Sequence, residues 1–405
     1  MKKIRLLALT TSYPLYPESS AGLFIRNLYR QMTARCSVEV VCPAEVAVPR
    51  TEDDAHAGIT VHAVRYAPRA WRTLAQVPGG VVSSLHRAPW RIMLLPVLLV
   101  SLFWRCLLRA GSADLIHANW AVCGVVAGIV GKLRKKPVVT TLRGSDVRRA
   151  AQSRLERTIL GLAINYSRVV ICVSEAMAEQ VRKEFPHRAD DIHVCLNGVD
   201  EAFFQHRKVT SDATALNVLA VGNLIRVKGF DVLIEAVARA RMRDRIHVCI
   251  IGEGPWRATL LSMAASKGVS DRFRFVGPVP ATEMPKRYAE ADVFVLSSRS
   301  EGRPNVVVEA LAGGLPVIST DLDGVQGMVA DGDTGWLVAV DDAEGLATAL
   351  DEAVADRVEL HRRGSRAREF AQLRIGTWRD TARCYEALFQ HALTTSSGQH
   401  PSCAE

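Results

Sequence analysis

Short runs of β-branched and other apolar residues alternate with longer helical patterns along this chain, and the alternation starts twice. Strands that are buried on both faces read as continuous apolar runs, so the pattern indicates parallel sheets built from strand–helix–strand units. The strands expected in the first half lie near residues 4–9, 38–42, 59–64, 114–117, 138–142, 169–173 and 192–196. Those expected in the second half lie near residues 217–221, 247–251, 273–276, 293–296, 317–319 and 336–338. The sequence therefore predicts an α/β protein with two doubly wound domains in tandem.

The length and one polar stretch indicate where the two domains meet. A chain of 405 residues fits two compact domains of about 100–200 residues each. Residues 208–214 are polar and aperiodic, and they lie between two expected strands. We therefore expect a first domain over residues 1–207, a second over 208–376 and a helix over 377–393. The Ser- and Thr-rich end, residues 394–405, is expected to be disordered.

Positive charge is concentrated in the first half of the chain. Residues 1–200 contain 27 Lys and Arg against 15 Asp and Glu, whereas residues 201–405 contain 24 against 27. A basic surface attracts nucleic acid, anionic lipid and phosphorylated substrates alike. No nucleic-acid-binding motif accompanies the basic residues, so we expect no nucleic-acid partner. The basic half is instead expected to meet the inner membrane surface or a phosphorylated substrate.

The cysteines and the start of the chain bear on the compartment. The nine cysteines form no CxxC pair and no Cys/His cluster, so they are expected to be small buried side chains in a reducing compartment. Residues 1–10 begin with basic residues, but their apolar run is too short for a signal peptide. A buried first strand and a cytoplasmic protein are therefore expected, with peripheral attachment to the cytoplasmic face of the membrane as an open possibility.

One segment is unusually apolar. Residues 92–104 carry no charge and are flanked by Arg91 and Arg105. A membrane span needs about 20 apolar residues, which makes a transmembrane helix the least favoured interpretation. Two others stay open: a helix buried against the first sheet, and an interfacial helix whose apolar side enters a lipid leaflet. In the second case nearby arginines would meet lipid phosphates, namely Arg65, Arg69, Arg72, Arg87 and Arg109.

In open α/β sheets ligands bind beyond the carboxyl ends of the strands, so residues that directly follow a strand are the candidates for a site. In the first half, Gly22 stands near the start of a helix whose free amides suit an anionic ligand. His117 and Asn119 follow a later strand, and a neutral imidazole there can exchange a proton with a substrate near pH 7. Arg143 and Asp146 follow the next strand. Structural roles are equally open: a plain loop at Gly22, a structural His117, and Asp146 as a helix cap.

In the second half, Lys228 lies at a helix start next to a glycine, which would bring its ammonium group to a phosphate that the helix dipole favours. Gly252 and Glu253 follow the next strand. Neither place carries the GxGxxG or the Walker pattern, so a nicotinamide dinucleotide fold is disfavoured.

The strongest signal is the segment from Glu301 to Glu309. Pro304 suits the first position of a helix, which leaves Glu301 in the preceding loop and Glu309 inside the helix. At about 1.5 Å of rise per residue, the two carboxylates are expected about 10 Å apart. That distance matches a nucleotide sugar, with one carboxylate at the hexose and the other at the ribose hydroxyls. The first-turn amides of Asn305 and Val306 would receive the diphosphate between them.

These residues resemble the retaining GT-B glycosyltransferases of the group 1 kind, a family that includes bacterial polysaccharide and lipid-glycan enzymes. The two glutamates and the residues that follow them, 310–317, are similar to the most specific signature of that family. Further similarity runs along nearly the whole chain, at residues 13–14, 22–25, 114–117, 144–146, 173–174, 197–200, 221–222, 228–229, 252–255 and 275–277.

The resemblance implies two Rossmann-like domains facing a central cleft, with the acceptor on the first, the nucleotide sugar on the second and the C-terminal helix crossing back to the first. It implies that Glu301 contacts the transferred sugar, that Glu309 holds the ribose, and that neither a metal nor another cofactor takes part. Lys228 and the first-turn amides would neutralise the leaving diphosphate as an oxocarbenium-like centre forms. The implied donor-binding residues are Gly22, Arg226, Lys228, Gly252, Glu253, Val276, Gly302, Asn305, Val306 and Glu309.

Three positions depart from the family pattern. Asn223 stands where the family often has an arginine, so either Arg226 substitutes for it or one phosphate donor is missing. The family often has His-x-His where this chain has His117 and Asn119, with His117 as the expected catalytic histidine. Arg143 stands where a histidine is common, and it is expected to bind an acceptor phosphate on the same side as Asn119 and Asp146.

The expected activity is transfer of a hexosyl-type sugar from a nucleotide diphosphate sugar to a lipid-linked or glycan acceptor, with retention of configuration. A sugar-nucleotide epimerase on the same architecture is the nearest enzymatic alternative. A non-catalytic membrane-surface protein would explain the basic half and the apolar segment. It would leave Lys228, Glu301 and Glu309 without a role.

Overall fold

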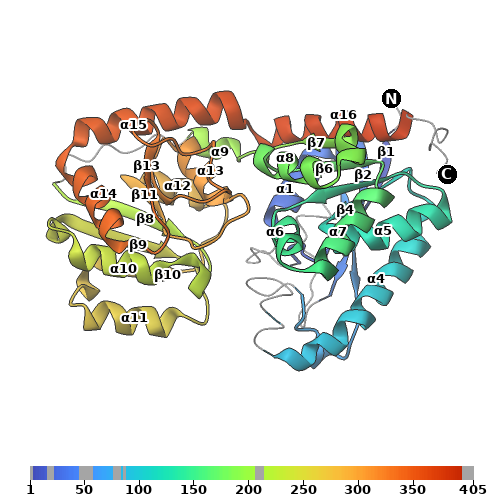
Figure 1. Cartoon of the computed structure of the whole chain (residues 1–405), viewed down its shortest axis with the longest axis horizontal. Helices are drawn as coiled ribbons and strands as arrows, with labels where there is room; N and C mark the ends of the chain where they lie inside the picture. The colour runs from blue at the N-terminus through green and yellow to red at the C-terminus, as the bar shows by residue number, and fades with distance from the viewer. Residues whose placement is uncertain are drawn as a thin grey trace. The chain divides into compact units, whose positions relative to one another are not determined.

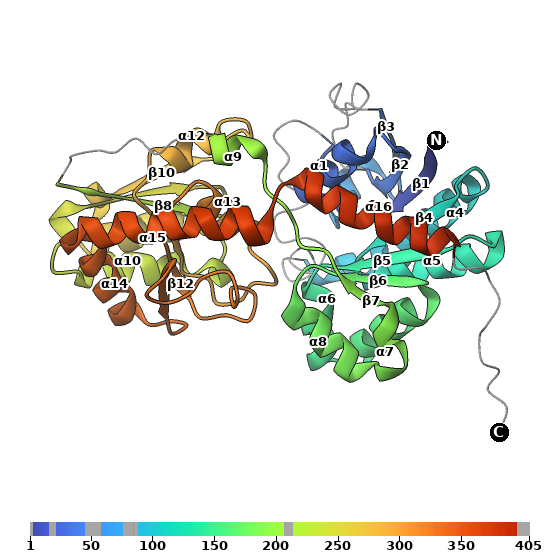
Figure 2. The same ribbon diagram turned by 90° about the horizontal axis from the view of Figure 1, so that it is seen from above.

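The computed structural model describes residues 3–15, 22–44, 58–75, 84, 88–205 and 214–394, and these form two wholly parallel sheets (Figure 1, Figure 2). Every strand predicted from the sequence is present. The strands of the first sheet are β1 (Ile4–Leu9), β2 (Cys36–Pro43), β3 (Ile59–Val64), β4 (Leu115–Asn119), β5 (Val138–Leu142), β6 (Val169–Cys172) and β7 (Ile192–Val194). The strands of the second sheet are β8 (Leu216–Val221), β9 (Ile246–Ile251), β10 (Phe273–Gly277), β11 (Val293–Leu296), β12 (Val317–Thr320) and β13 (Gly335–Val338).

Helices connect the strands and cover both sheets. Those in the first half are α1 (Leu23–Met32), α4 (Leu94–Ala110), α5 (Ala121–Arg134), α6 (Ser145–Gln152), α7 (Arg154–Tyr166) and α8 (Glu175–Glu184). Those that follow are α9 (Glu201–Gln205), α10 (Phe230–Arg239), α11 (Arg257–Ser266), α12 (Met284–Ala289), α13 (Asn305–Ala312), α14 (Ala343–Ala355), α15 (Arg357–Phe370) and α16 (Trp378–Thr394).

The strand order in each sheet creates one place where the direction of winding reverses. The first sheet runs β3-β2-β1-β4-β5-β6-β7 and the second runs β10-β9-β8-β11-β12-β13. The reversals therefore fall between β1 and β4 in the first sheet and between β8 and β11 in the second. Loops that leave the carboxyl ends of the two strands at a reversal diverge and leave a crevice, which is where open α/β sheets bind ligands.

Two apolar cores cover the two faces of the second sheet. One joins the strands to α10, α11 and α14, and the other joins them to α9, α12, α13 and α15. Tyr288 of α12 and Phe294 of β11 are fully buried in the second of these cores and stack on each other. The helix α13, which carries candidate residues, is thus held together with α12 by packing that involves large aromatic side chains.

The chain divides into a first unit of residues 1–195 and 381–405 and a second unit of residues 196–380. The sequence predicts a boundary near residue 208. The structure instead places residues 196–205 in the second unit. The physical reason is packing and pairing: Phe203 of α9 is buried in the core of the second unit, and Val199 pairs with Thr377 in an isolated bridge. The polar stretch that suggested residue 208 includes residues outside the described ones.

The helix predicted over 377–393 is α16, and its residues from Thr381 onward belong to the first unit, which confirms the crossing back of the C-terminal helix. Tyr385 and Phe389 of α16 are fully buried and contact the ring of His117 in β4. Of the predicted tail, residues 395–405 lie outside the described residues, and Thr394 is the last residue of α16.

The cysteines depart in one respect from the sequence expectation. Cys195, directly after β7, and Cys384 of α16 form a disulfide bond. The expectation of nine unpaired buried cysteines was therefore wrong for these two, and the cysteines do not support the expected reducing compartment. Nothing in the local sequence signals a pair with a separation of 189 residues. Of the other described cysteines, five are buried thiols and Cys249 is partly buried.

The apolar segment near residues 92–104 forms α4, preceded by the 3-10 turn η2 (Pro89–Met93). One side of α4 packs into the core of the first unit with β1, β2 and α5. The opposite side is exposed. Among the described residues, the stretch Pro89–Ala110 is long and apolar enough to cross a membrane by length and composition alone. One side of α4 therefore covers the first sheet, as in the buried-helix interpretation, and the opposite side of the helix is not covered by the described residues.

Candidate active site

The loops that follow β8 and β11 meet at the reversal point of the second sheet. Lys228, in the 3-10 turn η4 (Arg226–Lys228), donates from Nζ to Oε1 of Glu301 at 2.6 Å. Ser298 Oγ donates to the same carboxylate oxygen at 2.7 Å. The side chains of Lys228 and Glu301 are 21% and 12% exposed, so both are accessible but largely desolvated. The structure thus brings together two predicted site residues from loops 73 positions apart in the sequence.

Glu309 lies on α13, behind the loop that carries Glu301. Its Oε2 accepts a hydrogen bond of 2.9 Å from the hydroxyl of Tyr288. Burial raises the pKa of Glu309 to about 7, against a lowering contribution from the Tyr288 hydrogen bond and a further raising contribution from Asp200. The carboxyl group therefore exchanges its proton close to neutrality. Sequence analysis missed Tyr288, because nothing in the pattern of α12 distinguishes it from an ordinary core tyrosine.

The N-terminus of α13 presents backbone donors beside these carboxylates. The helix begins at Asn305, one residue later than predicted, with Pro304 as its N-cap. The amides of Val307 and Val308 donate to the carbonyl of Pro304. Within the part of the chain that the structure describes, the amides of Asn305 and Val306 have no backbone or side-chain acceptor. Two donors at the positive end of a helix dipole form a ready site for an anion.

Arg303 fixes the start of α13 and was missed by the sequence analysis. Its Nη1 donates to the carbonyl of Asn197 at 3.0 Å, and Asn197 Nδ2 donates to Oδ1 of Asn305 at 3.1 Å. Burial lowers the pKa of Arg303 to about 10. A desolvated guanidinium and an amide pair thus hold the first residue of α13 against the segment that follows β7.

Glycines let the loops after β8 and β9 approach each other. Gly252 has a φ of 140°, and a Cβ on it would collide with the backbone of Gly222. Its amide donates to the carbonyl of Gly277 at 2.9 Å. Next to it, Val276 lies at a register shift between β10 and β9. The carbonyl of Gly302 packs closely against Gly324. Predicted glycine positions therefore shape this edge of the sheet.

Two predicted donor residues make no side-chain contact with the Lys228 and Glu301 pair among the described residues. Arg226 is exposed, and its carbonyl accepts from Nη1 of Arg299 and from the amide of Gly229. The carboxylate of Glu253 is exposed and lies 3.7 Å from Arg257. Arg299 was not singled out from the sequence, yet it bonds Asp231 of α10 and Asp341 of the loop after β13. With its bond to the Arg226 carbonyl, it ties the loop after β11 to η4 and to both of these segments.

In the first unit, the loops after β1, β4 and β5 bring Gly22, Phe24, Trp120 and Arg143 to the reversal point. Gly22 has a φ of 73°, and a Cβ there would collide with the carbonyl of Ser12. The guanidinium of Arg143 lies 4.8 Å from the ring centre of Phe24, which contacts the Trp120 ring edge to face at 6.2 Å. Trp120 has a φ of 70° and a ψ of 151°, a strained backbone for a residue with a side chain. Strain of this kind is concentrated at functional sites.

The placement of His117 argues against the catalytic role predicted for it. The side chain is fully buried, with Nδ1 at 2.9 Å from the Tyr29 hydroxyl and Nε2 at 2.8 Å from Thr141 Oγ1. Burial, with a smaller contribution from Arg143, holds the pKa of His117 well below its ordinary value. Both ring nitrogens are engaged inside the protein, so the imidazole acts as a core polar group. Its partners come from distant elements, which the sequence pattern does not reveal.

Asp146, predicted on the acceptor side, is likewise buried and bonded to the backbone of its own unit. It is 2% exposed and accepts hydrogen bonds from the amides of Arg143, Gly144 and Ala121. It therefore satisfies backbone amides at the starts of α5 and α6 from a position in the first turn of α6, whose N-cap residue is Gly144. This is a structural role, although it differs from the N-cap that was the alternative in the sequence. Asn119 is also fully buried, and its Oδ1 accepts from Nη2 of Arg143 at 2.6 Å. Asn119 thus orients Arg143, the one predicted acceptor-side residue that is partly exposed.

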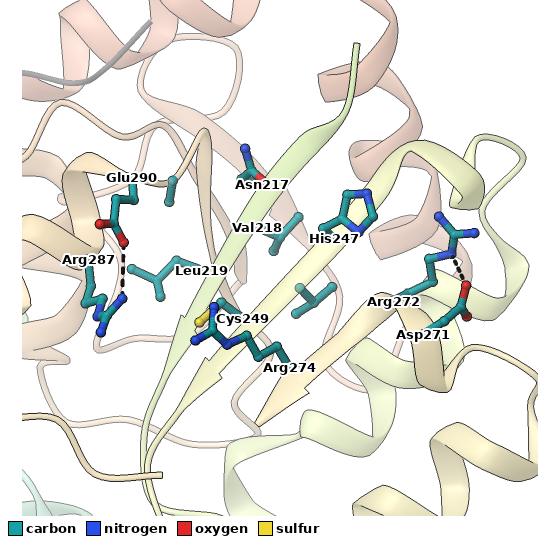
Figure 3. A pocket seen from close by; sticks show the side chains of 12 residues that line it. Asn217, Val218, Leu219, His247, Cys249, Asp271, Arg272, Arg274, Arg287 and Glu290 are labelled. Atoms are coloured by element: carbon teal, nitrogen blue, oxygen red, sulfur yellow. Dashed lines mark hydrogen bonds and ion pairs between the residues drawn. The ribbon is translucent and has the colours of Figure 1, made fainter. Parts of the chain in front are cut away.

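Two further observations delimit the site. A cavity of about 300 Å³ is lined by Asn217 and His247, at the starts of β8 and β9, and by Arg274 and Arg287. Figure 3 shows how these side chains lie. The cavity lies at the amino ends of the strands and is therefore separate from the candidate site at their carboxyl ends. In the described ranges, no group of three or more His, Cys, Asp or Glu side chains is arranged to hold a metal ion.

Two Rossmann-like units, with carboxylates, a lysine and a helix N-terminus at the reversal point of the second, define the GT-B class of glycosyltransferase folds. Residues 201–370 match the family "Glycosyl transferases group 1" and residues 21–203 match "Glycosyltransferase Family 4". The HepE protein of Anabaena, solved with UDP-glucose, superposes with a TM-score of 0.73 over 96% of this chain and 100% of that one, at 19% identity. At this identity the likeness shows the fold.

Sequence similarity to known glycosyltransferases establishes the family as well as the fold. The D-inositol 3-phosphate glycosyltransferase of Corynebacterium efficiens is 31% identical over 310 residues, which is 69% of this chain and 72% of that protein. The lipopolysaccharide core biosynthesis glycosyltransferase LpsE of Rhizobium meliloti is 40% identical over 160 residues, 39% of this chain and 46% of that protein. The latter match thus spans less than half of its relative. The chain belongs to the group 1 glycosyltransferases, a family of retaining enzymes that use nucleotide sugars.

Proposed function

We propose that this protein transfers a hexosyl unit, with retention of configuration, from a nucleotide diphosphate sugar to a lipid-linked or glycan acceptor. The observation that carries the proposal is the convergence of Lys228, Glu301 and the N-terminus of α13 at the reversal point of the second sheet. A lysine and free amides suit the phosphate charge, and carboxylates suit the hydroxyl groups of the sugar and the ribose.

The donor is expected to span the site from Glu301 to Glu309. The amides of Asn305 and Val306 and the ammonium of Lys228 would stabilise the negative charge that develops on the departing diphosphate, which is the largest electrostatic demand of the reaction. Lys228 is paired with Glu301 in this structure, so an arriving phosphate would compete for it. Glu301 would then be released to accept hydrogen bonds from the sugar, and Glu309 would hold the ribose.

The acceptor is expected at the carboxyl edge of the first sheet. Arg143, oriented by Asn119 and lying against Phe24, would bind an acceptor phosphate or carboxylate. The partly exposed ring of Trp120 offers an apolar surface next to it, on which a sugar ring can pack. The name of LpsE, a lipopolysaccharide core enzyme, supports a lipid-linked glycan as the acceptor class.

We further propose that the protein works in the cytoplasm, peripherally at the cytoplasmic face of the membrane. The excess of Lys and Arg over Asp and Glu in residues 1–200 supports this location, because the cytoplasmic leaflet carries a negative surface potential. A lipid-linked acceptor would be met at that surface.

Thermal melting in the presence of UDP, GDP, ADP and dTDP, each with and without magnesium, tests the donor site. A nucleotide at 100 times its dissociation constant adds about 2.7 kcal/mol to the stability of the folded protein. We expect one nucleotide to shift the melting temperature without magnesium, and we expect Glu309→Ala to lose that shift. Glu283→Ala, at an exposed position of the same unit, is the matched control.

The donor sugar that corresponds to that nucleotide then separates the alternatives. A transferase leaves the nucleotide sugar intact until an acceptor is added, and its product keeps the anomeric configuration of the donor, as read by NMR. Epimerisation of the donor alone would replace the proposal by the epimerase alternative. Absence of any nucleotide-dependent shift would replace it by the non-catalytic one.

A further inference from the structure

The helix α4 is apolar on two opposite sides, and only one of them is used by the fold. Leu98, Leu102 and Cys106 have no exposed surface and pack into the core of the first unit. The other side carries a second apolar stripe that is 47–76% exposed, formed by Met93, Val97, Val100, Trp104 and Leu108. These positions recur every three or four residues, so they form one continuous line along the helix. Isolated exposed apolar side chains are common, but a continuous line of them marks an interaction site.

Two more tryptophans extend the stripe at its N-terminal end. Trp71, in the 3-10 turn η1 (Arg69–Trp71), and Trp90 in η2 are 53% and 51% exposed. Their rings contact each other edge to face at 5.9 Å. With Trp104, 56% exposed, three tryptophans lie on the outer surface of this region. Tryptophan is enriched where an apolar phase meets water and polar headgroups, because its ring is both apolar and a hydrogen-bond donor.

Arginines predominate in the segment that forms the stripe. From residue 55 to residue 113 the sequence contains seven arginines and no Asp, Glu or Lys. Arg105 is exposed on α4, and Arg72 and Arg91 are partly exposed near the tryptophans. Among the described residues of this region, Glu39 of β2 is an acidic side chain, and it pairs with Arg109 and His62. A basic border around an apolar stripe complements a surface that is anionic at its headgroups and apolar beneath them.

We propose that this surface, defined by Trp71, Trp90, Met93, Val97, Val100, Trp104 and Leu108, docks on an anionic phospholipid leaflet with α4 lying in the plane of the interface. The burial of Leu98, Leu102 and Cys106 excludes a membrane span, because α4 would have to leave the core of the first unit to cross the bilayer. A second copy of the chain fits less well, because a two-fold contact through this stripe would bring the same arginines face to face. The inference deepens the proposed function, on whose lipid-linked acceptor it rests.

Vesicle flotation of the full chain tests the proposal. We expect the wild type to float with vesicles of phosphatidylcholine and phosphatidylglycerol, to bind less at high salt, and to bind weakly to phosphatidylcholine alone. Trp104→Glu changes an exposed side chain and should lower the partition coefficient about tenfold or more, since it removes one large apolar group from the leaflet. Val358→Glu, at an 81% exposed apolar position of α15 in the second unit, is the matched control and should float like the wild type.

Two outcomes would overturn the docking surface: a wild type that does not float with the anionic vesicles, and a Trp104→Glu variant that floats as well as Val358→Glu. Light scattering without vesicles tests whether a second copy of the chain covers this surface instead. A dimeric wild type and a monomeric Trp104→Glu variant would replace the lipid leaflet by that second copy. The nucleotide-dependent melting shift is measured on all three proteins. If the shift is present and flotation absent, docking alone fails; if the shift is absent and flotation present, the proposed transferase function fails alone.

Discussion

Glu309 is the residue whose protonation changes nearest to neutral pH. Its pKa in the folded protein is about 7, whereas an unperturbed glutamate titrates near 4.5, and burial is the main cause. Between these two values the folded chain binds a proton that the unfolded chain has released. The contribution of Glu309 to stability is therefore fully present below 4.5 and is lost as the pH rises through about 7.

We predict that Glu309→Gln, which keeps the shape and cannot ionise, raises the melting temperature relative to wild type more at about pH 8 than at about pH 5. The reason is that the wild-type carboxylate carries its desolvation cost only at the higher pH. Thermal melts of both proteins over this range measure the difference. A difference that does not change with pH would contradict the titration of Glu309 in this range.

A second prediction concerns the ion pair between Lys228 and Glu301 in the proposed donor site. Glu301→Gln should leave the affinity for the nucleoside diphosphate unchanged or increase it, because Lys228 loses its competing carboxylate. Turnover should fall strongly, since the sugar loses its contact. Lys228→Met should weaken nucleotide binding by about 10- to 100-fold, the range expected for a charge-assisted hydrogen bond. Calorimetric titration with the nucleotide and a transfer assay give the two readouts; weaker nucleotide binding in Glu301→Gln would count against the competition.

The placement of site residues that lie close together in the sequence was predictable. The placement of residues whose partners are distant in the sequence was not. Glu301, Glu309 and the amides of α13 come from a single loop and helix start, so their placement follows from local chain geometry. The burial of His117 depends on Tyr29, Thr141 and Tyr385, which lie on three other elements. No periodicity in the sequence joins these elements.

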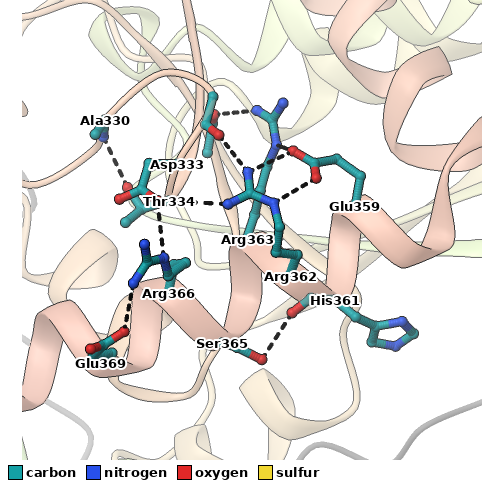
Figure 4. A network of polar contacts seen from close by, with 12 residues as sticks. Ala330, Asp333, Thr334, Glu359, His361, Arg362, Arg363, Ser365, Arg366 and Glu369 are labelled. Atoms are coloured by element: carbon teal, nitrogen blue, oxygen red, sulfur yellow. Dashed lines mark hydrogen bonds and ion pairs between the residues drawn. The ribbon is translucent and has the colours of Figure 1, made fainter.

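At the scale of elements, α15 is bound to the loop before β13 by a polar network (Figure 4). Arg363 stacks on the ring of Trp336 at 3.9 Å and donates to Glu359 Oε1 at 2.7 Å. The guanidinium is 12% exposed, and Arg363 also donates to the carbonyl of Gly335. Arg366, one turn further on, is 54% exposed and pairs with Asp333 and Glu369.

We predict that Arg363→Ala lowers the free energy of unfolding by about 1–3 kcal/mol, because it removes buried hydrogen bonds and an aromatic contact together. Arg366→Ala should change it by no more than about 0.5 kcal/mol, as expected of exposed ion pairs. Urea denaturation of the two variants compares them directly. Equal losses would mean that the network, and not the buried guanidinium, holds α15 in place.

The elements themselves were the most predictable level of this structure. Each strand is a short apolar run, and inner strands such as β5 and β11 are buried on both faces, whereas the edge strands β3 and β10 are only partly buried. Such runs stand out from the helical pattern around them. The boundary between the units was less predictable, because it depends on where chain segments pack and not on their polarity. The sequence assigns residues 196–205 to the first domain, yet Phe203 and Val199 join the second unit.

For the whole molecule, the disulfide between Cys195 and Cys384 secures α16 to the first unit. It closes a loop of 189 residues, so in the chain-entropy model it restricts the unfolded state strongly. We predict that replacing both cysteines by alanine lowers the free energy of unfolding by about 2–5 kcal/mol. Reducing agent should lower the melting temperature of the wild type to that of the variant. Cys249→Ala, which changes a free thiol, should keep the response to reducing agent, and alkylation of both Cys195 and Cys384 without reduction would contradict the bond.

The division of the chain also sets the order in which the two units can be completed on the ribosome. The second unit is one continuous stretch, residues 196–380, so it has all of its strands and helices once that stretch has emerged. The first unit begins earlier but still lacks α16, whose Tyr385 and Phe389 cover the ring of His117. Domains fold as they emerge during synthesis. The unit translated first is therefore completed last, and the ring of His117 on its central strand β4 stays uncovered until α16 has been synthesised.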